Sequence, residues 1–136
     1  MQFVINNWYL FLALAAVLGM LLANPVRQRL YRVKSASPAD AVQIINRQSG
    51  VVVDVCEPQE FRNGHIPSAL NVPLSGFAAY LKQLEKYKDR PLVVVCRSGN
   101  RSLTAAVALR KHGFGTVYLL AGGLAAWQRD NLPLEK

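Results

Sequence analysis

The run of apolar, mostly β-branched residues from Leu92 to Val95 constrains the fold most, because it suits a strand buried on both faces of a sheet. Residues 51–55 and 116–120 are predicted as two further strands, and helical patterns lie between the three. Strands that alternate with helices of these lengths require a parallel sheet covered by helices on both faces. The sequence therefore predicts an α/β fold that binds ligands beyond the carboxyl ends of its strands.

Local signals set the ends of the predicted helices. Ser37 suits a helix cap, Pro38 the first helical position and Asp40 the first turn, and Gly50 closes this helix. A helix at 102–112 is bounded by a C-terminal glycine. The predicted elements in chain order are a strand at 31–34, the helix that Ser37 caps, a strand at 51–55, a helix at 75–87, a strand at 92–95, a helix at 102–112 and a strand at 116–120.

Cys96 lies where a predicted strand turns into a helix, and this position favours an ionised thiol. The backbone N–H groups of a tight loop and of a helix's first turn have no intrahelical partners, so they favour negative charge. Arg97 and Arg101 add positive charge, and Gly99 lets the backbone adopt conformations that a side chain opposes. We therefore expect a thiolate, with a pKa in the range of about 3.5–7.5 seen for such cysteines. The alternative is that Cys96 is one more small buried hydrophobe.

The length of this loop separates two kinds of cysteine and arginine chemistry. Four residues lie between Cys96 and Arg101, one fewer than in the phosphate-binding loop of tyrosine-phosphatase-type enzymes, and Val95 stands where those enzymes usually have histidine. The tighter loop suits one extra sulfur atom better than a tetrahedral oxyanion, which disfavours a phosphatase or an arsenate reductase. The stretch Cys96-Arg97-Ser98-Gly99-Asn100-Arg101-Ser102 resembles the active-site loop of rhodanese-type sulfurtransferases.

Two further motifs resemble the same family, in the same order along the chain. The first, within residues 54–73, consists of Gly64, His65, Ile66, Ala69, Asn71 and Pro73, and the second of Leu120, Ala121, Gly122, Gly123 and Trp127. The resemblance covers residues 35–133 and implies the rhodanese-like parallel sheet flanked by helices. It also implies that His65 is structural rather than a catalytic base, and we expect Trp127 to pack in the core.

The activity that this resemblance implies is transfer of sulfane sulfur. Cys96 would be the catalytic nucleophile and would hold the sulfur as a persulfide, while Arg97, Ser98, Gly99, Asn100 and Arg101 would bind the substrate. A small anionic compound such as thiosulfate would be the donor, and a thiol or cyanide the acceptor. The family needs no metal and no organic cofactor. The alternative is a rhodanese-like module that binds a partner protein without catalytic turnover.

A second cysteine stands in a motif where the family often has another residue. Cys56 occupies a place where arginine is frequent, and Ser68 one where glycine is frequent. The strands that end at Cys56 and Cys96 are neighbours in the family's sheet, and neighbouring strands lie about 4.8 Å apart. Cys56 would therefore either resolve the persulfide or form a protective disulfide with Cys96, or else be an inert buried thiol.

The amino-terminal segment has the composition of a membrane anchor. Residues 1–26 carry no charged side chain, and the apolar stretch at 3–23 is interrupted only by Asn6 and Asn7. At about 1.5 Å per residue this stretch reaches across a hydrocarbon core of about 30 Å. A cleaved signal peptide is the rival interpretation, although no basic residue precedes the apolar run. We expect an anchor at 1–26, a basic linker at 27–34 and a rhodanese-like domain at 35–136.

Basic residues follow the apolar run directly and set the expected orientation. Arg27, Arg29, Arg32 and Lys34 supply half of the formal net charge of +8. The positive-inside tendency then predicts a single-pass protein of the inner (plasma) membrane with its domain in the cytoplasm, where thiols stay reduced. The linker would be solvated or would contact lipid headgroups. Because the charge is concentrated there, no nucleic-acid partner is expected.

Overall fold

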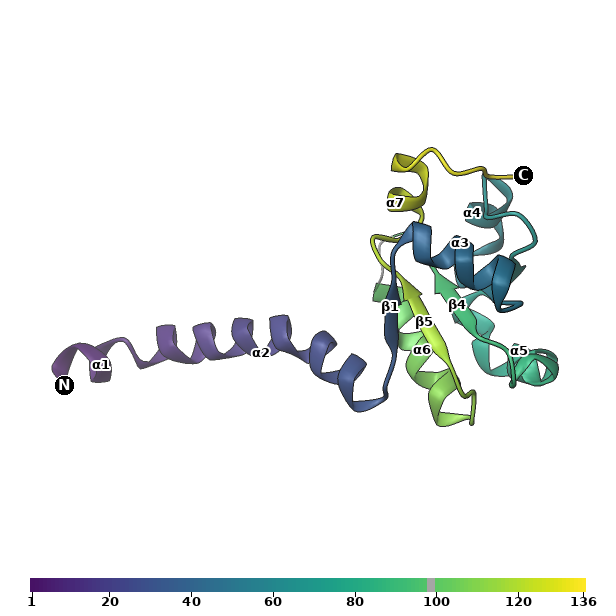
Figure 1. Cartoon of the computed structure of the whole chain (residues 1–136). Coiled ribbons are helices and arrows are strands. Elements are labelled where there is room, and N and C mark those ends of the chain that lie inside the picture. Colours follow the sequence, from purple (N-terminus) through teal and green to yellow (C-terminus); the bar gives the residue numbers. More distant parts are fainter. Residues whose placement is uncertain (98–99) are drawn as a thin grey trace.

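The computed structural model describes residues 1–97 and 100–136 and contains a five-stranded sheet (Figure 1). The strands are β1 (Lys34–Ala36), β2 (Val51–Asp54), β3 (Leu70–Asn71), β4 (Leu92–Val95) and β5 (Val117–Leu120). They lie in the order β1-β5-β4-β2-β3, and every neighbouring pair is parallel. The predicted α/β fold with a parallel sheet is confirmed.

Helices follow the strands and cover both faces of the sheet. They are α3 (Pro38–Arg47), α4 (Pro58–Arg62), α5 (Phe77–Leu84), α6 (Asn100–Lys111) and α7 (Gly123–Arg129). Crossovers between parallel strands are right-handed, so those that run in opposite directions along a sheet place their helices on opposite faces. The chain crosses in one direction through α3 and returns through α5 and α6, so α3 lies in front of the sheet in Figure 1 and α6 behind it.

The first helix of the domain forms as its sequence predicts. The Ser37 hydroxyl oxygen accepts a hydrogen bond from the Asp40 backbone N–H at 3.1 Å, and Pro38 occupies the first turn. Ala41 and Ile44 face the sheet and are buried. All four residues of β4 are also buried, as expected for a strand covered on both sides.

The first strand lies later in the chain than predicted. The sequence predicts a strand at 31–34, but α2 (Trp8–Leu30) continues through Arg27 and Arg29, and Tyr31 is the residue that ends it. The strand therefore begins only at Lys34 and ends at Ala36, which is buried against the core. Here the helix extends through the charged residues that followed its apolar run.

Other elements also differ from the prediction, and neither the short strand β3 nor the helix α7 was predicted. The helix predicted at 75–87 has its regular part only at α5, with 3-10 turns at Leu74–Gly76 and Glu85–Tyr87 on either side. The short helix α4 was not predicted, although its start carries a recognisable signal. Pro58 stands in its first turn, and a capping box joins Glu57 to Glu60.

The amino-terminal helix α2 extends away from the domain (Figure 1). A short helix, α1 (Gln2–Asn6), precedes it. The large apolar side chains of α2 are exposed, and by length and composition this helix is able to cross a membrane. It meets the domain beside α6, where the Arg110 Nε donates a hydrogen bond to the Tyr31 carbonyl oxygen at 2.9 Å.

Candidate active site

Cys96 follows β4 directly, at the carboxyl edge of the sheet, and its side chain is buried. Arg97 is exposed, Asn100 begins α6 and Arg101 lies in its first turn. Ser98 and Gly99, which the sequence also assigns to the substrate site, lie outside the described residues. The α6 helix begins at Asn100, two residues earlier than predicted, so only three positions separate Cys96 from the first residue of the helix.

The end of β2 lies beside the end of β4. Asp54 pairs with Val95 in the register of the two strands, and the Val55 N–H donates a hydrogen bond to the Val95 carbonyl oxygen at 3.0 Å. Cys56 therefore lies at the end of the strand neighbouring that of Cys96, as the sequence predicts. Neither cysteine, both of which the structure describes, is joined in a disulfide.

Cys56 has the surroundings of an unreactive thiol. It is buried, and its N–H donates a hydrogen bond to the Asp54 Oδ1 at 2.9 Å. Burial and the neighbouring Asp54 carboxyl raise the pKa of the Cys56 thiol to about 12. Burial also raises the pKa of Asp54 itself. A thiol that stays protonated is a poor nucleophile, which favours the inert alternative over a resolving role.

Glu60 joins both arginines of the loop, and sequence reasoning missed it. Arg101 donates two hydrogen bonds to this carboxylate, from Nη1 to Oε1 at 2.7 Å and from Nη2 to Oε2 at 3.1 Å. The Arg97 Nε lies 3.5 Å from Oε2. The hydrogen bonds from Arg101 lower the pKa of Glu60 to about 2, and the same pair raises the pKa of Arg101. Only the capping box of α4 marks Glu60 in the sequence, and it gives no sign of a partner 41 positions away.

The two arginines consequently have different surroundings. The Arg101 guanidinium is held by a bidentate pair, and its side chain is 33% exposed. The Arg97 side chain is 56% exposed, and its ion pair among the residues that the structure describes is the longer contact with Glu60. Arg101 therefore fixes the start of α6 against α4, whereas the Arg97 guanidinium remains accessible to an anion.

The tip of α7 supports the start of the loop. The Leu124 N–H donates a hydrogen bond to the Cys96 carbonyl oxygen at 3.0 Å. Gly122 and Gly123 have φ values of +75° and +62°, which favour glycine. A Cβ on Gly123 would overlap the Cys96 carbonyl oxygen and lie 2.7 Å from that of Arg97. The paired glycines thus let two backbone segments approach closely beneath the cysteine.

His65 and Trp127 make the contacts of structural residues. The His65 ring stacks on Phe61 with centroids 3.7 Å apart, its Nδ1 lies 2.8 Å from the Phe61 carbonyl oxygen, and its Nε2 lies 3.3 Å from the Glu135 carboxylate. Trp127 is buried, and its Nε1 donates a hydrogen bond to the Pro133 carbonyl oxygen at 2.9 Å. The expectation that Trp127 packs in the core is confirmed.

A cavity of about 290 Å³ opens beside the loop. Asn63 and Gly64 from the end of α4, Arg97, and three residues of α7 line it, namely Leu124, Ala125 and Gln128. Amide groups and a guanidinium make this wall polar, and Arg97 is its charged member. The arrangement suits a small anionic molecule.

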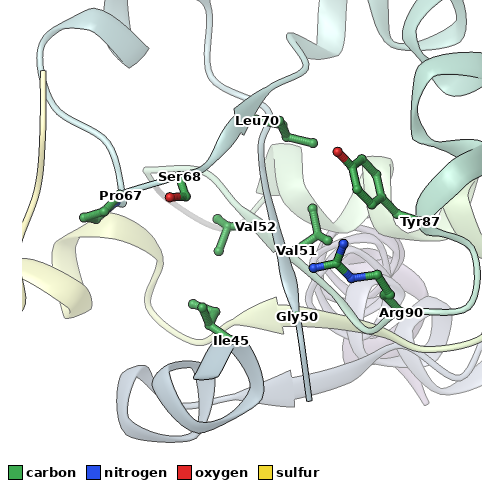
Figure 2. Close-up of a pocket in the computed structure, with 9 residues that line it drawn as sticks. All are labelled: Ile45, Gly50, Val51, Val52, Pro67, Ser68, Leu70, Tyr87 and Arg90. Carbon is green, nitrogen blue, oxygen red and sulfur yellow. The ribbon is translucent and has the colours of Figure 1, made fainter. Parts of the chain in front are cut away.

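A second cavity, of about 170 Å³, lies between Tyr87, Arg90 and the start of β2 (Figure 2). The Arg90 Nε donates a hydrogen bond to the Ser49 carbonyl oxygen at 2.7 Å, and the guanidinium carbon lies 5.3 Å from the centroid of the Tyr87 ring. The parallel strands β2 and β4 run away from this end, and Cys96 follows the far end of β4. This cavity therefore lies opposite the candidate site.

Glu60 makes stability depend on pH in a defined direction. Its pKa is lower in the folded chain than when unfolded, so its stabilisation is complete above the ordinary pKa of 4.5 and is lost as the pH falls toward about 2. Replacing Glu60 by Gln is expected to cost about 1–3 kcal/mol of unfolding free energy at pH 7, since hydrogen bonds to a charged group are lost. Urea melts of both proteins between about pH 6 and pH 2.5 measure this effect. The difference in unfolding free energy between the two proteins should shrink as the pH falls. A difference that does not change with pH would contradict the role of the Glu60 charge.

Comparisons with known proteins agree with this geometry. A model of the family described as the Rhodanese-like domain matches residues 37–130. The uncharacterized protein YibN of Escherichia coli (strain K12) is 38% identical over 135 residues, which cover 98% of this chain and 94% of that protein. Thiosulfate sulfurtransferase GlpE of Pseudomonas syringae pv. syringae is 38% identical over 98 residues, covering 72% of this chain and 90% of GlpE.

Solved structures share the fold. The crystal structure of a rhodanese-related protein from Thermoplasma volcanium is 32% identical and superposes with a TM-score of 0.67, covering 75% of this chain and 97% of that one. The rhodanese-like parallel sheet expected from the sequence is confirmed.

Proposed function

The chain belongs to the rhodanese-like domain family, and on that premise we propose that it is a sulfurtransferase that carries sulfur on Cys96. The observation that carries the proposal is the position of Cys96, between the end of β4 and the start of α6, with Arg97 and Arg101 beside it. Backbone N–H groups at the start of a helix stabilise negative charge on sulfur. The relatives named thiosulfate sulfurtransferase support thiosulfate as the donor.

The reaction has two steps that pass one sulfur atom. The Cys96 thiolate attacks the outer sulfur of thiosulfate, a new sulfur–sulfur bond forms, and sulfite leaves with the electron pair of the broken bond. An acceptor nucleophile then attacks the outer sulfur of the Cys96 persulfide and releases the thiolate. Cyanide as acceptor yields thiocyanate, and a thiol yields a persulfide of its own. No electrons are gained or lost overall.

The residues around Cys96 have distinct roles in these steps. Arg97 orients the anionic donor in the cavity beside the loop. Arg101 is held by Glu60 and is a positioning residue for the loop that contains Ser98, Gly99 and Asn100. The backbone of that loop would stabilise the persulfide anion, as the family motif implies.

Turnover is the direct test of this function. The purified full chain in detergent is expected to form thiocyanate and sulfite from thiosulfate and cyanide. Cys96 is buried in this structure, and that observation favours a second candidate, a membrane-tethered rhodanese-like module that binds a partner without turnover. Absence of thiocyanate together with a partner protein that co-purifies in equal amount would support the second candidate and contradict the first.

Arg97→Ala is expected to raise the KM for thiosulfate about tenfold and to change kcat much less. A charge-assisted hydrogen bond to the donor, worth about 1.5–3 kcal/mol, is lost in the ground state and in the transition state alike. Arg62→Ala is the matched control, because Arg62 is an exposed arginine of α4 that does not line the cavity. Equal changes in KM for both variants would mean that Arg97 acts only through the general field of the surface.

The apolar helix α2 supports a membrane anchor. We infer that residues 1–26 cross the inner membrane once, that 27–34 form a basic juxtamembrane segment, and that the domain at 35–136 lies in the cytoplasm. Arg27 and Arg29 in the last turn of α2 support this orientation. A reporter that works only in the cytoplasm should be active when it is fused after Lys136. Activity of a reporter that works only outside the cytoplasm would contradict this orientation.

A further inference from the structure

A pocket of about 190 Å³ lies where α2 meets α6, lined by Leu30, Tyr31, Arg32 and Arg110. It is separate from the candidate active site. Arg110 lies in the last turn of α6 and Arg101 in the first, which places about 14 Å of helix between them. The pocket therefore belongs to the opposite end of the domain, next to the membrane helix.

Arg110 is fixed at the wall of this pocket. Its Nε donates a hydrogen bond to the Tyr31 carbonyl oxygen at 2.9 Å, and its Nη1 donates to the carbonyl oxygens of Phe114 and Gly115 at 2.7 and 2.6 Å. All three acceptors are neutral backbone groups, so the positive charge is not neutralised. A guanidinium held in one place loses little freedom when it binds an anion.

Arg32 supplies a second guanidinium to the same pocket. Arg32 is exposed and lies two residues past the end of α2, where its φ is +56°. Within the part of the chain that the structure describes, no aspartate or glutamate forms an ion pair with Arg32 or Arg110. The first acidic residue of the sequence is Asp40. Two arginines with uncompensated charge thus line one small cavity.

The pocket lies at the depth of lipid headgroups if α2 crosses a membrane. The helix from Trp8 to Arg27 is about 29 Å long, close to the hydrocarbon core of about 30 Å. Tyr31 and Arg32 follow about 6–8 Å further along. The headgroup region adds about 5–7 Å on each side of the core, which places Arg32 at its outer edge, and Arg110 lines the same pocket.

We propose that this pocket binds the phosphate group of an anionic phospholipid through the guanidinium groups of Arg32 and Arg110. Arginine matches phosphate in geometry and is favoured where two parallel hydrogen bonds form. Arg27 and Arg29 nearby add to the attraction of an anionic surface. The proposal rests on the membrane span proposed above and is independent of the chemistry at Cys96.

A headgroup held there sets the orientation of the domain. Lys34 begins β1 close to the pocket, and Phe114 and Gly115 precede β5, so the pocket lies at the amino ends of the strands. Cys96 lies at the carboxyl ends. The bound lipid would therefore keep the sulfur-transfer site directed away from the bilayer, toward substrates dissolved in water.

The test measures the lipid that the full chain retains. The chain is reconstituted in nanodiscs of equal parts phosphatidylcholine and phosphatidylglycerol, and native mass spectrometry counts the lipids that remain bound after release. We expect phosphatidylglycerol to be enriched and Arg32→Gln to reduce its retention at least tenfold. Arg29→Gln is the matched control, since it removes the same charge one turn away without touching the pocket, and should cost no more than about fivefold.

Each other outcome contradicts the proposal. Equal losses for the two variants would mean that only the surface potential acts, and no enrichment would mean that the pocket binds no anionic lipid. Inorganic phosphate, added to the chain in phosphatidylcholine nanodiscs, should leave the melting temperature unchanged. A rise that disappears in Arg32→Gln would assign the pocket to soluble phosphate instead. A chain that does not enter nanodiscs would refute the span, while its turnover of thiosulfate would still be measurable.

Discussion

Cys96→Ser is expected to abolish the formation of sulfite from thiosulfate, with a fall in rate of at least about 10³-fold. A serine hydroxyl is a far weaker nucleophile than a thiolate and cannot hold the transferred sulfur as a persulfide. The substitution replaces one small buried side chain by another, so the fold should be retained. Initial rates of thiocyanate and sulfite formation, with thermal melts of both proteins, measure the effect.

The control for this variant is the second cysteine. Cys56→Ala should keep most of the activity, because the Cys56 thiol is buried beside Asp54 and stays protonated at neutral pH. If Cys56→Ala were as inactive as Cys96→Ser while melting normally, Cys56 would have to take part in the reaction. The resolving role considered from the sequence would then replace the inert one.

Gly123→Ala is expected to lower the melting temperature by at least about 8 °C and to remove activity with it. The left-handed conformation costs a side-chain-bearing residue about 1–2 kcal/mol. The overlap of the new Cβ with the Cys96 and Arg97 carbonyl oxygens adds about 1–3 kcal/mol, because backbone atoms have little room to move. For a domain of this size each kcal/mol corresponds to about 4–8 °C.

Gly115→Ala provides the comparison for that prediction. A Cβ on Gly115 has nothing within 4 Å, and its backbone is not in the left-handed region. This variant should melt within about 2 °C of the parent, as surface substitutions away from special features do. If Gly123→Ala melted as Gly115→Ala does, the close approach of α7 to the active-site loop would be disproved.

Most of the sheet was predictable because buried parallel strands leave a plain signal. Continuous apolar runs such as that of β4 have few other interpretations when helices flank them. The start of α3 was equally clear, since Ser37 and Pro38 occupy the positions that capping requires. These features depend on residues close together in the sequence.

Features that depend on distant partners were not predictable in the same way. The Glu60–Arg101 pair joins residues 41 positions apart, and nothing local to Glu60 indicates it. The two arginines of the loop therefore looked equivalent in the sequence, although one is held by a carboxylate and the other is exposed. The position of β1 was missed because α2 continues past its apolar run, and the end of that helix is set by its packing against α6.

The most direct test of sulfur transfer through Cys96 is the intact mass of the full chain after exposure to thiosulfate and removal of excess reagent. The protein should gain the mass of one sulfur atom, lose it again on treatment with cyanide, and gain nothing as Cys96→Ser. An unchanged mass in the unmodified protein, or a gain that persists in Cys96→Ser, would contradict the account.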